Sequence, residues 1–247
     1  MKTIKWVMTS LVCIQTSLLF VTPHSPAYAA DIVRQPSVKA GSTADDFWTR
    51  DHLFGDMGGL RTQLHDMGID FQIGYVSESV TNWTGGKDQY VVNAGQATFG
   101  TTFDLQRLLG DPNAIFQITL TSRSGSSLGN AADLGTLMGV NELHGRGNIV
   151  RLTQFYYDQT FANGTWDWKI GRLTIGEDFA AFSCDFINLT FCGNPSGNMR
   201  GNYIYNWPVS QWGTRIKTLI PDFGYAQVGI YDVNKAYLNT APQYALA

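Results

Sequence analysis

Apolar and polar side chains alternate along much of the chain between residues 69 and 231, the period of β-strands whose two faces differ. The clearest case is the stretch from Gln96 to Arg123. Two alternating runs there flank the turn sequence Asp111-Pro112-Asn113 and predict a hairpin. The same pattern predicts further strands, seven in total with this hairpin, at 69–75, 149–159, 166–170, 211–217 and 225–231. One face is apolar and rich in aromatic residues, which fits a transmembrane wall, although soluble β-sandwiches alternate in the same way.

The lengths of the predicted connections decide between these two folds. They alternate long and short, and loops of about 23 and 34 residues follow Arg123 and Leu173. Barrels of bacterial outer membranes have short periplasmic turns and long external loops. We therefore predict an all-β fold, an antiparallel transmembrane β-barrel wall. In the strand 149–159 the alternation does not settle which side chains face outward, and we place Val150 and Leu152 outward.

The segments before the first strand differ from the barrel wall. The first 29 residues resemble a secretory signal, with Lys2 and Lys5, an apolar stretch and an Ala27-Tyr28-Ala29 cleavage site. Leu60, Leu64 and Met67 recur at helical spacing. We divide the chain into a signal peptide (1–29), a flexible lead (30–46), a short helical periplasmic segment (47–68), a partial barrel (69–233) and a truncated external loop (234–247).

Composition narrows the classes of function. Only 15% of residues are charged and the formal net charge is −3, which argues against nucleic acid as a partner. The four histidines lie apart and show no metal-ligand spacing. Cys184 and Cys192 are the two cysteines outside the signal segment, and we predict a disulfide between them. Gly125–Gly129 fits the nucleophile motif of hydrolases, but its acid and histidine partners are poorly provided, so we do not expect an enzyme.

Several longer motifs together resemble the OprB-type carbohydrate-selective porins of bacterial outer membranes. These motifs are Leu53–Leu64 (LFGDMGGLRTQL), Val150–Gln159 (VRLTQFYYDQ), Lys169–Leu173 (KIGRL), Phe191–Gly193 (FCG), Tyr205–Arg215 (YNWPVSQWGTR) and Gly229–Asn234 (GIYDVN). The family pattern usually has Trp where this chain has Met57. The resemblance implies a sixteen-stranded barrel, passive uptake of sugars, an outer-membrane location and no cofactor.

The family barrel is longer than this chain, and the resemblance covers only its N-terminal half. Seven strands would leave the chain outside the membrane at residue 234, with unpaired edges on the first and last strands. A family-sized barrel needs about nine more strands. We therefore expect a curled, open sheet and a fragment of a longer gene.

Charged residues on the polar face are the candidate sugar site. Strand parity directs Arg123, Arg151, Arg215 and Lys217 into the lumen, and Glu142 follows in a long loop that would have to fold inward. Arginine and carboxylate groups suit sugar hydroxyls, which both donate and accept hydrogen bonds. The alternative is that any one of them is a solvated charge of the pore wall. The orientation of Arg172 stays open.

Three functions remain in view on the sequence alone. They are a sugar-selective porin whose partners are carbohydrate and outer-membrane lipid, a general porin without sugar preference, and a secreted glycan-binding or structural β protein. The sequence leaves open which sugar is bound, how wide the pore is and the oligomeric state.

Overall fold

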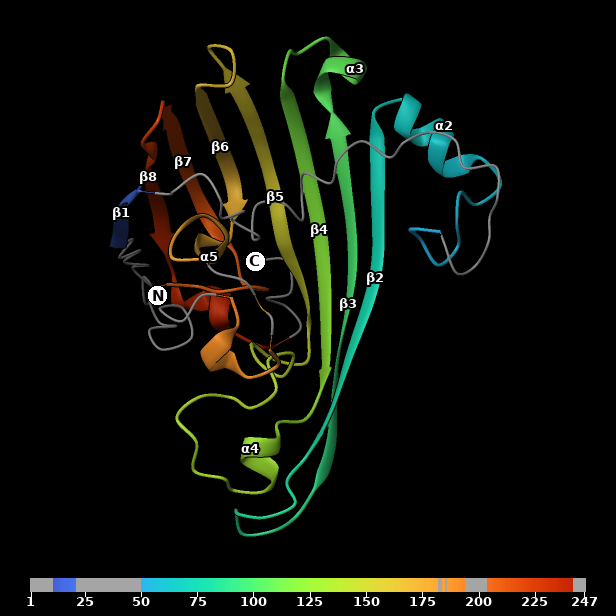
Figure 1. Ribbon diagram of the computed structural model, residues 1–247, viewed down its shortest axis with the longest axis vertical. Coiled ribbons are helices and arrows are strands. Elements are labelled where there is room, and N and C mark those ends of the chain that lie inside the picture. The colour runs from blue at the N-terminus through green and yellow to red at the C-terminus, as the bar shows by residue number, and fades with distance from the viewer. Residues whose placement is uncertain (1–10, 21–49, 182–183, 185, 194–203, 242–247) are drawn as a thin grey trace, which may run out of the picture.

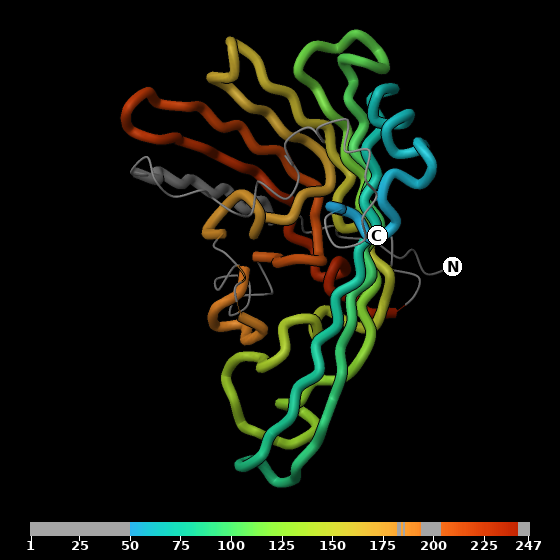
Figure 2. Tube along the Cα trace, turned by 45° about the vertical axis from the view of Figure 1, so that its right-hand side comes forward, coloured from blue at the N-terminus to red at the C-terminus, as the bar shows by residue number. Residues whose placement is uncertain are grey.

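The computed structural model describes residues 11–20, 50–181, 184, 186–193 and 204–241. Its main feature is one eight-stranded antiparallel sheet, in the order β1-β8-β7-β6-β5-β4-β3-β2. The strands are β1 (Leu11–Phe20), β2 (Ile69–Thr81), β3 (Val91–Asp104), β4 (Ala114–Gly125), β5 (Val150–Phe161), β6 (Trp166–Leu173), β7 (Gln211–Ile220) and β8 (Gly224–Val233). All strands expected from the alternation are present, and the sheet curls around one concave face (Figures 1 and 2).

The sheet is open, as expected. β1 and β2 form its two edges, and no pairing among the described residues joins them. β1 pairs with β8 along Leu11–Phe20, inside the segment we interpret as a signal peptide. Such a peptide is removed on export, so this pairing would belong to the precursor only. The signal peptide stays a prediction, and the lead expected at 30–46 lies outside the described residues.

The helices are short and lie in the connections. They are α2 (Leu60–Asp66), α3 (Leu105–Leu109), α4 (Leu128–Ala131), α5 (Ile175–Asp178) and the 3₁₀-helices η1 (Leu189–Phe191) and η2 (Lys235–Leu238). Among the described residues, no helix is long and apolar enough to cross a bilayer. α2 confirms the predicted helix, and its Arg61 lies over the ring of Phe71 on β2. The external loop expected from residue 234 begins instead with η2, and its last residues, 242–247, are outside the described part.

Long connections and short turns lie at opposite ends of the sheet (Figure 1). The connection 126–149 and the described part of 174–210 fold back into the concave side, whereas 162–165 and 221–223 are tight turns (Figures 1 and 2). The first two connections, 82–90 and 105–113, do not follow the expected alternation in length. β2 and β3 extend further than predicted and shorten the first, while α3 occupies the second.

The sheet buries its polar face and exposes its apolar face. The buried polar side chains of β4 are Gln117, Thr119, Thr121 and Arg123. On the other face Ile73, Phe99, Ile170, Trp212 and Ile230 are exposed. This inversion of a soluble core is what a wall between lipid and an aqueous lumen requires.

The outer face can be tested on β2 with two neighbouring positions of opposite parity. Ile73 is 62% exposed on the apolar face, and Gln72 lies beside it on the polar face. We expect Ile73→Lys to destabilise the membrane-inserted form by about 2–4 kcal/mol, because an amine then faces hydrocarbon. The measurement is the fraction of heat-modifiable, folded band on a gel after urea titration in detergent or vesicles. Gln72→Lys is the control, and an equal loss in both variants would contradict the assignment of the faces.

Candidate functional site

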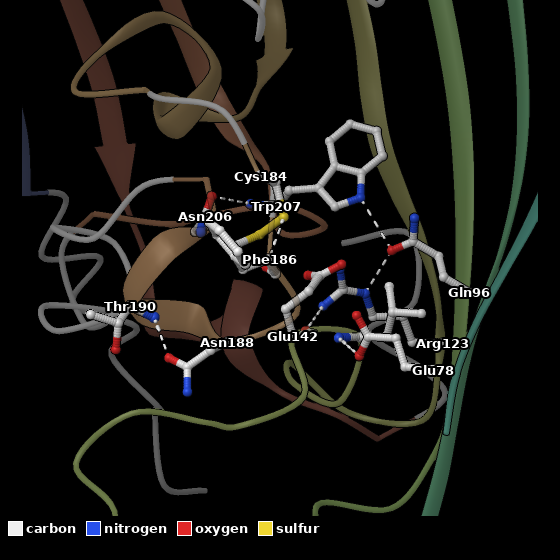
Figure 3. Close-up of a disulfide and its surroundings, with 12 residues drawn as sticks. Glu78, Gln96, Arg123, Glu142, Cys184, Phe186, Asn188, Thr190, Asn206 and Trp207 are labelled. Carbon is white, nitrogen blue, oxygen red and sulfur yellow. Dashed lines mark hydrogen bonds and ion pairs between the residues drawn. A yellow bond between two sulfur atoms is a disulfide. The ribbon is translucent and has the colours of Figure 1, made fainter. Parts of the chain in front are cut away.

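Arg123 is the centre of a group of polar residues on the concave face (Figure 3). Its guanidinium donates from Nε to Gln96 Oε1 at 2.7 Å, from Nη1 to the Glu142 carbonyl at 3.1 Å and from Nη2 to Glu142 Oε2 at 3.4 Å. Trp207 Nε1 donates to the same Gln96 oxygen at 3.3 Å. We call Gln96, Arg123, Glu142 and Trp207 the Arg123 cluster. The cluster joins the wall strands β3 and β4 to the two long connections, 126–149 and 174–210.

The connection 126–149 brings Glu142 inward, as the candidate site required. Asn141 Nδ2 donates to the carbonyl of Ser126, and its Oδ1 accepts from Leu128 N. The backbone amide of Leu143 then donates to Glu78 Oε2 on β2 at 3.1 Å. The Asn141 bonds tie the loop to its own first residues, and the Leu143 bond ties it to the wall, so the backbone is held on both sides of Glu142. Within this loop the Ser127 hydroxyl accepts the amide of Asn130 as the N-cap of α4, which accounts for the serine of the hydrolase-like motif.

Arg215 and Lys217 belong to a second group further along the wall. Arg215 Nη1 lies 2.9 Å from Asp167 Oδ1, and its Nη2 lies 3.3 Å from Asp178 Oδ1. Lys169 contacts Asp178 at 3.4 Å and Asp158 at 4.0 Å, and Lys217 lies 3.5 Å from Asp167 Oδ2. We call this set the Arg215 cluster: Asp158, Asp167, Lys169, Asp178, Arg215 and Lys217. Each cation has a carboxylate partner, so the cluster crosslinks β5, β6, β7 and α5.

Apolar packing also holds α5 against the wall. Ile175 and Phe179 pack with Tyr156, Leu173 and Tyr231 in one buried group. Glu177 accepts from Gln154 Nε2 at 2.7 Å, and burial raises the pKa of its carboxyl to about 7.

Arg151 and Arg172 make contacts of a different kind. Arg151 points inward, as expected, and donates to the backbone carbonyls of Arg146, Tyr237 and Asn239. It thus fastens two connections to β5, and the structure does not add it to either cluster. Arg172, whose orientation the sequence left open, is buried at the end of β6. It donates to Ser210 and lies 4.7 Å from the centre of the Tyr237 ring.

The predicted disulfide between Cys184 and Cys192 is present. Both sulfurs and a carboxylate oxygen of Glu142 lie within 4.8 Å of one another, a spacing that could hold a metal ion. However, the metal ligand is the thiolate, and both sulfurs here share a covalent bond. In this state the three groups do not form a metal site.

The Arg123 cluster combines donors, acceptors and an aromatic ring at one point of a polar wall. This arrangement offers hydrogen bonds and an aromatic face to a neutral polyhydroxyl compound. Residues 88–246 match the family model described as carbohydrate-selective porin, OprB family. The chain belongs to this family.

Similar proteins match along most of the chain. It is 41% identical over 202 residues to Porin B of Pseudomonas aeruginosa, a match that covers 79% of this chain and 44% of that protein. It is 38% identical over 205 residues to the putative porin QuiX of Acinetobacter baylyi, covering 80% and 47%. The high-pH structure of Pseudomonas putida OprB matches with a TM-score of 0.75 and 41% identity, covering 77% of this chain and 47% of that one. The chain thus spans about half the length of the OprB relatives it matches.

Several residues of the two clusters, and Glu78 beside the Arg123 cluster, were not among the candidates from the sequence. Gln96 lies directly opposite Arg123 in the β3–β4 register, so the hairpin and its parity were enough to find it. Glu78 lies on the predicted inward parity of β2, but beyond the end that we assigned to this strand. Trp207 and Asp178 lie in the long connection 174–210, where no periodicity indicates their position.

Proposed function

We propose that the protein is part of an outer-membrane porin through which sugars diffuse passively and selectively. The observation that carries this proposal is the Arg123 cluster. Its guanidinium, carboxylate, amide and indole meet on the inner wall of a chain that belongs to the carbohydrate-selective porin family. Glucose-like mono- or oligosaccharides are the proposed substrate class.

The chemistry of the cluster supports a sugar better than an ion. Arg123 and Glu142 neutralise each other at 3.4 Å, so the cluster has little net charge to attract either sign. A sugar hydroxyl can accept from the guanidinium while it donates to the carboxylate. Trp207 adds an indole, whose face suits the apolar face of a pyranose ring. Because the groups already bond to one another, a passing sugar exchanges hydrogen bonds and is not trapped.

The exposed apolar face favours a membrane location over the alternative of a secreted glycan-binding protein. Ile73, Phe99, Ile170 and Ile230 lie exposed on four different strands. A contiguous surface of this kind lowers its free energy in hydrocarbon and not in water. This surface supports the proposed location in the bacterial outer membrane.

Conductance in a planar bilayer tests the proposal. We expect the porin that contains this chain, extracted from outer membranes in detergent, to give stepwise channels, whose ion current falls as glucose or maltose is added and saturates with concentration. A polyethylene glycol of similar size controls for viscosity and simple exclusion. Equal effects of sugar and polyethylene glycol would support a general porin. Recovery of the protein in the soluble fraction without detergent would overturn both porin hypotheses.

A further inference from the structure

The loop closed by Cys184 and Cys192 lies directly beside the Arg123 cluster (Figure 3). Both sulfurs lie within 4.8 Å of a Glu142 carboxylate oxygen, the same side chain that pairs with Arg123. Glu142 is thus placed between the disulfide and the guanidinium. The loop comes from the connection between β6 and β7, whereas Glu142 belongs to the one between β4 and β5.

Further contacts join these two connections next to the disulfide. The backbone amide of Leu189 donates to the Gly139 carbonyl at 3.0 Å. The two residues are also packed tightly, because a Cβ built on Gly139 would lie 2.9 Å from Leu189 Cδ1. The disulfide loop is therefore in contact with residues 139–142 through a hydrogen bond, close packing and the approach of Glu142.

The same loop lies close to Asn206, the residue that bonds to the second part of the cluster, Trp207. A Cβ built on Gly193, the residue after Cys192, would lie 3.5 Å from Asn206 Nδ2. Asn206 Oδ1 in turn accepts the backbone amide of Trp207 at 2.9 Å, and Trp207 donates to Gln96. The disulfide is thus adjacent both to the carboxylate and to the support of the indole.

We propose that the Cys184–Cys192 disulfide is a positioning element of the permeation path and makes its sugar selectivity sensitive to thiol reductants. The bond holds Glu142 at Arg123 and Trp207 at Gln96. A dithiol reductant delivers two electrons and two protons. The S–S bond breaks, two S–H groups form and the reductant becomes a disulfide. The freed loop then has more conformations, and Glu142 loses a fixed neighbour. This inference rests on the proposed sugar pathway.

Local mobility tests the positioning without any sugar. We expect dithiothreitol, and the double variant Cys184→Ser/Cys192→Ser, to speed amide hydrogen exchange in peptides covering 139–143 and 186–192. Exchange in β4 and β5 is the internal control and should not change. Unchanged exchange at 139–143 after complete reduction, confirmed by mass spectrometry of alkylated thiols, would overturn the proposal.

Sugar block of conductance tests the consequence. We expect reduction to raise the sugar concentration for half-block by roughly three- to tenfold, which corresponds to the renewed freedom of one or two side chains. Reduction should have a smaller effect in a Glu142→Gln channel, because the disulfide acts partly through that carboxylate. An equal rise of the half-block concentration on reduction in the wild-type and Glu142→Gln channels would contradict the mechanism. If no sugar blocks the oxidised wild type while exchange still responds, the proposed function fails and the positioning role stands.

Discussion

Replacing Arg215 with methionine is expected to destabilise the folded chain by about 3–5 kcal/mol, the cost of breaking a buried ion pair. Only 2% of the Arg215 side chain is exposed, and it bridges Asp167 and Asp178. Without it both carboxylates stay buried with incomplete partners, and α5 loses a link to β7. The measurement is urea unfolding followed by gel mobility in detergent, with the midpoint compared with that of the wild type.

Two variants show whether burial causes this loss. Lys87 pairs with Asp133 on the surface, where the two side chains are 79% and 57% exposed. Lys87→Met should change stability by about 1 kcal/mol or less, because water screens such pairs. Arg215→Lys keeps the charge but loses the two-pronged guanidinium, so its urea midpoint should lie between those of the wild type and Arg215→Met. A wild-type midpoint for Arg215→Met would show that the Arg215 cluster does not hold α5.

The fold was predictable because the two faces of the wall differ in polarity. Alternation in residues 96–123 gave the hairpin and the orientation of Arg123, and helical spacing gave α2. β5 is the exception. Thr119 pairs with Gln154 while Leu120 pairs with Leu152, so Thr153 is an extra residue in the ladder. Such a bulge shifts the parity between Arg151 and Gln154 and hides the alternation. The outward placement of Val150 and the inward placement of Arg151 were nevertheless correct, whereas Leu152 is half-buried.

The positions of site residues were predictable only where strand register determines them. Gln96 and Arg123 follow from register, but Trp207 reaches Gln96 from 111 positions away in sequence. Contacts of this range depend on how long connections pack, and no local pattern encodes them. For the same reason the sequence grouped Arg123, Arg151, Arg215 and Lys217 together as one site. The structure separates them into the Arg123 cluster, the Arg215 cluster and an anchor of the loops.

The largest expected effect on sugar passage follows from Arg123→Ala. It removes the donors to Gln96 and Glu142 from the centre of the Arg123 cluster. A hydrogen bond to a charged group contributes about 1.5–3 kcal/mol, so we expect the sugar concentration for half-block to rise roughly 10- to 100-fold. Ion conductance without sugar should change much less, because removing a paired side chain widens the path without adding a barrier. Both quantities come from the same bilayer recordings.

Three further variants separate recognition from a general loss of structure. Arg123→Lys keeps a charge but cannot present two parallel N–H groups, so its affinity should fall between wild type and Arg123→Ala. Glu142→Gln should weaken sugar block as well, because the acceptor becomes neutral. The sequence alone places Arg151 in the same site, yet its hydrogen bonds go to backbone carbonyls of Arg146, Tyr237 and Asn239. We therefore expect Arg151→Ala to lower the urea midpoint and to alter half-block less than Arg123→Ala. If Arg123→Ala keeps the wild-type block, Arg123 is a structural charge of the pore wall, and sugar selectivity must arise elsewhere.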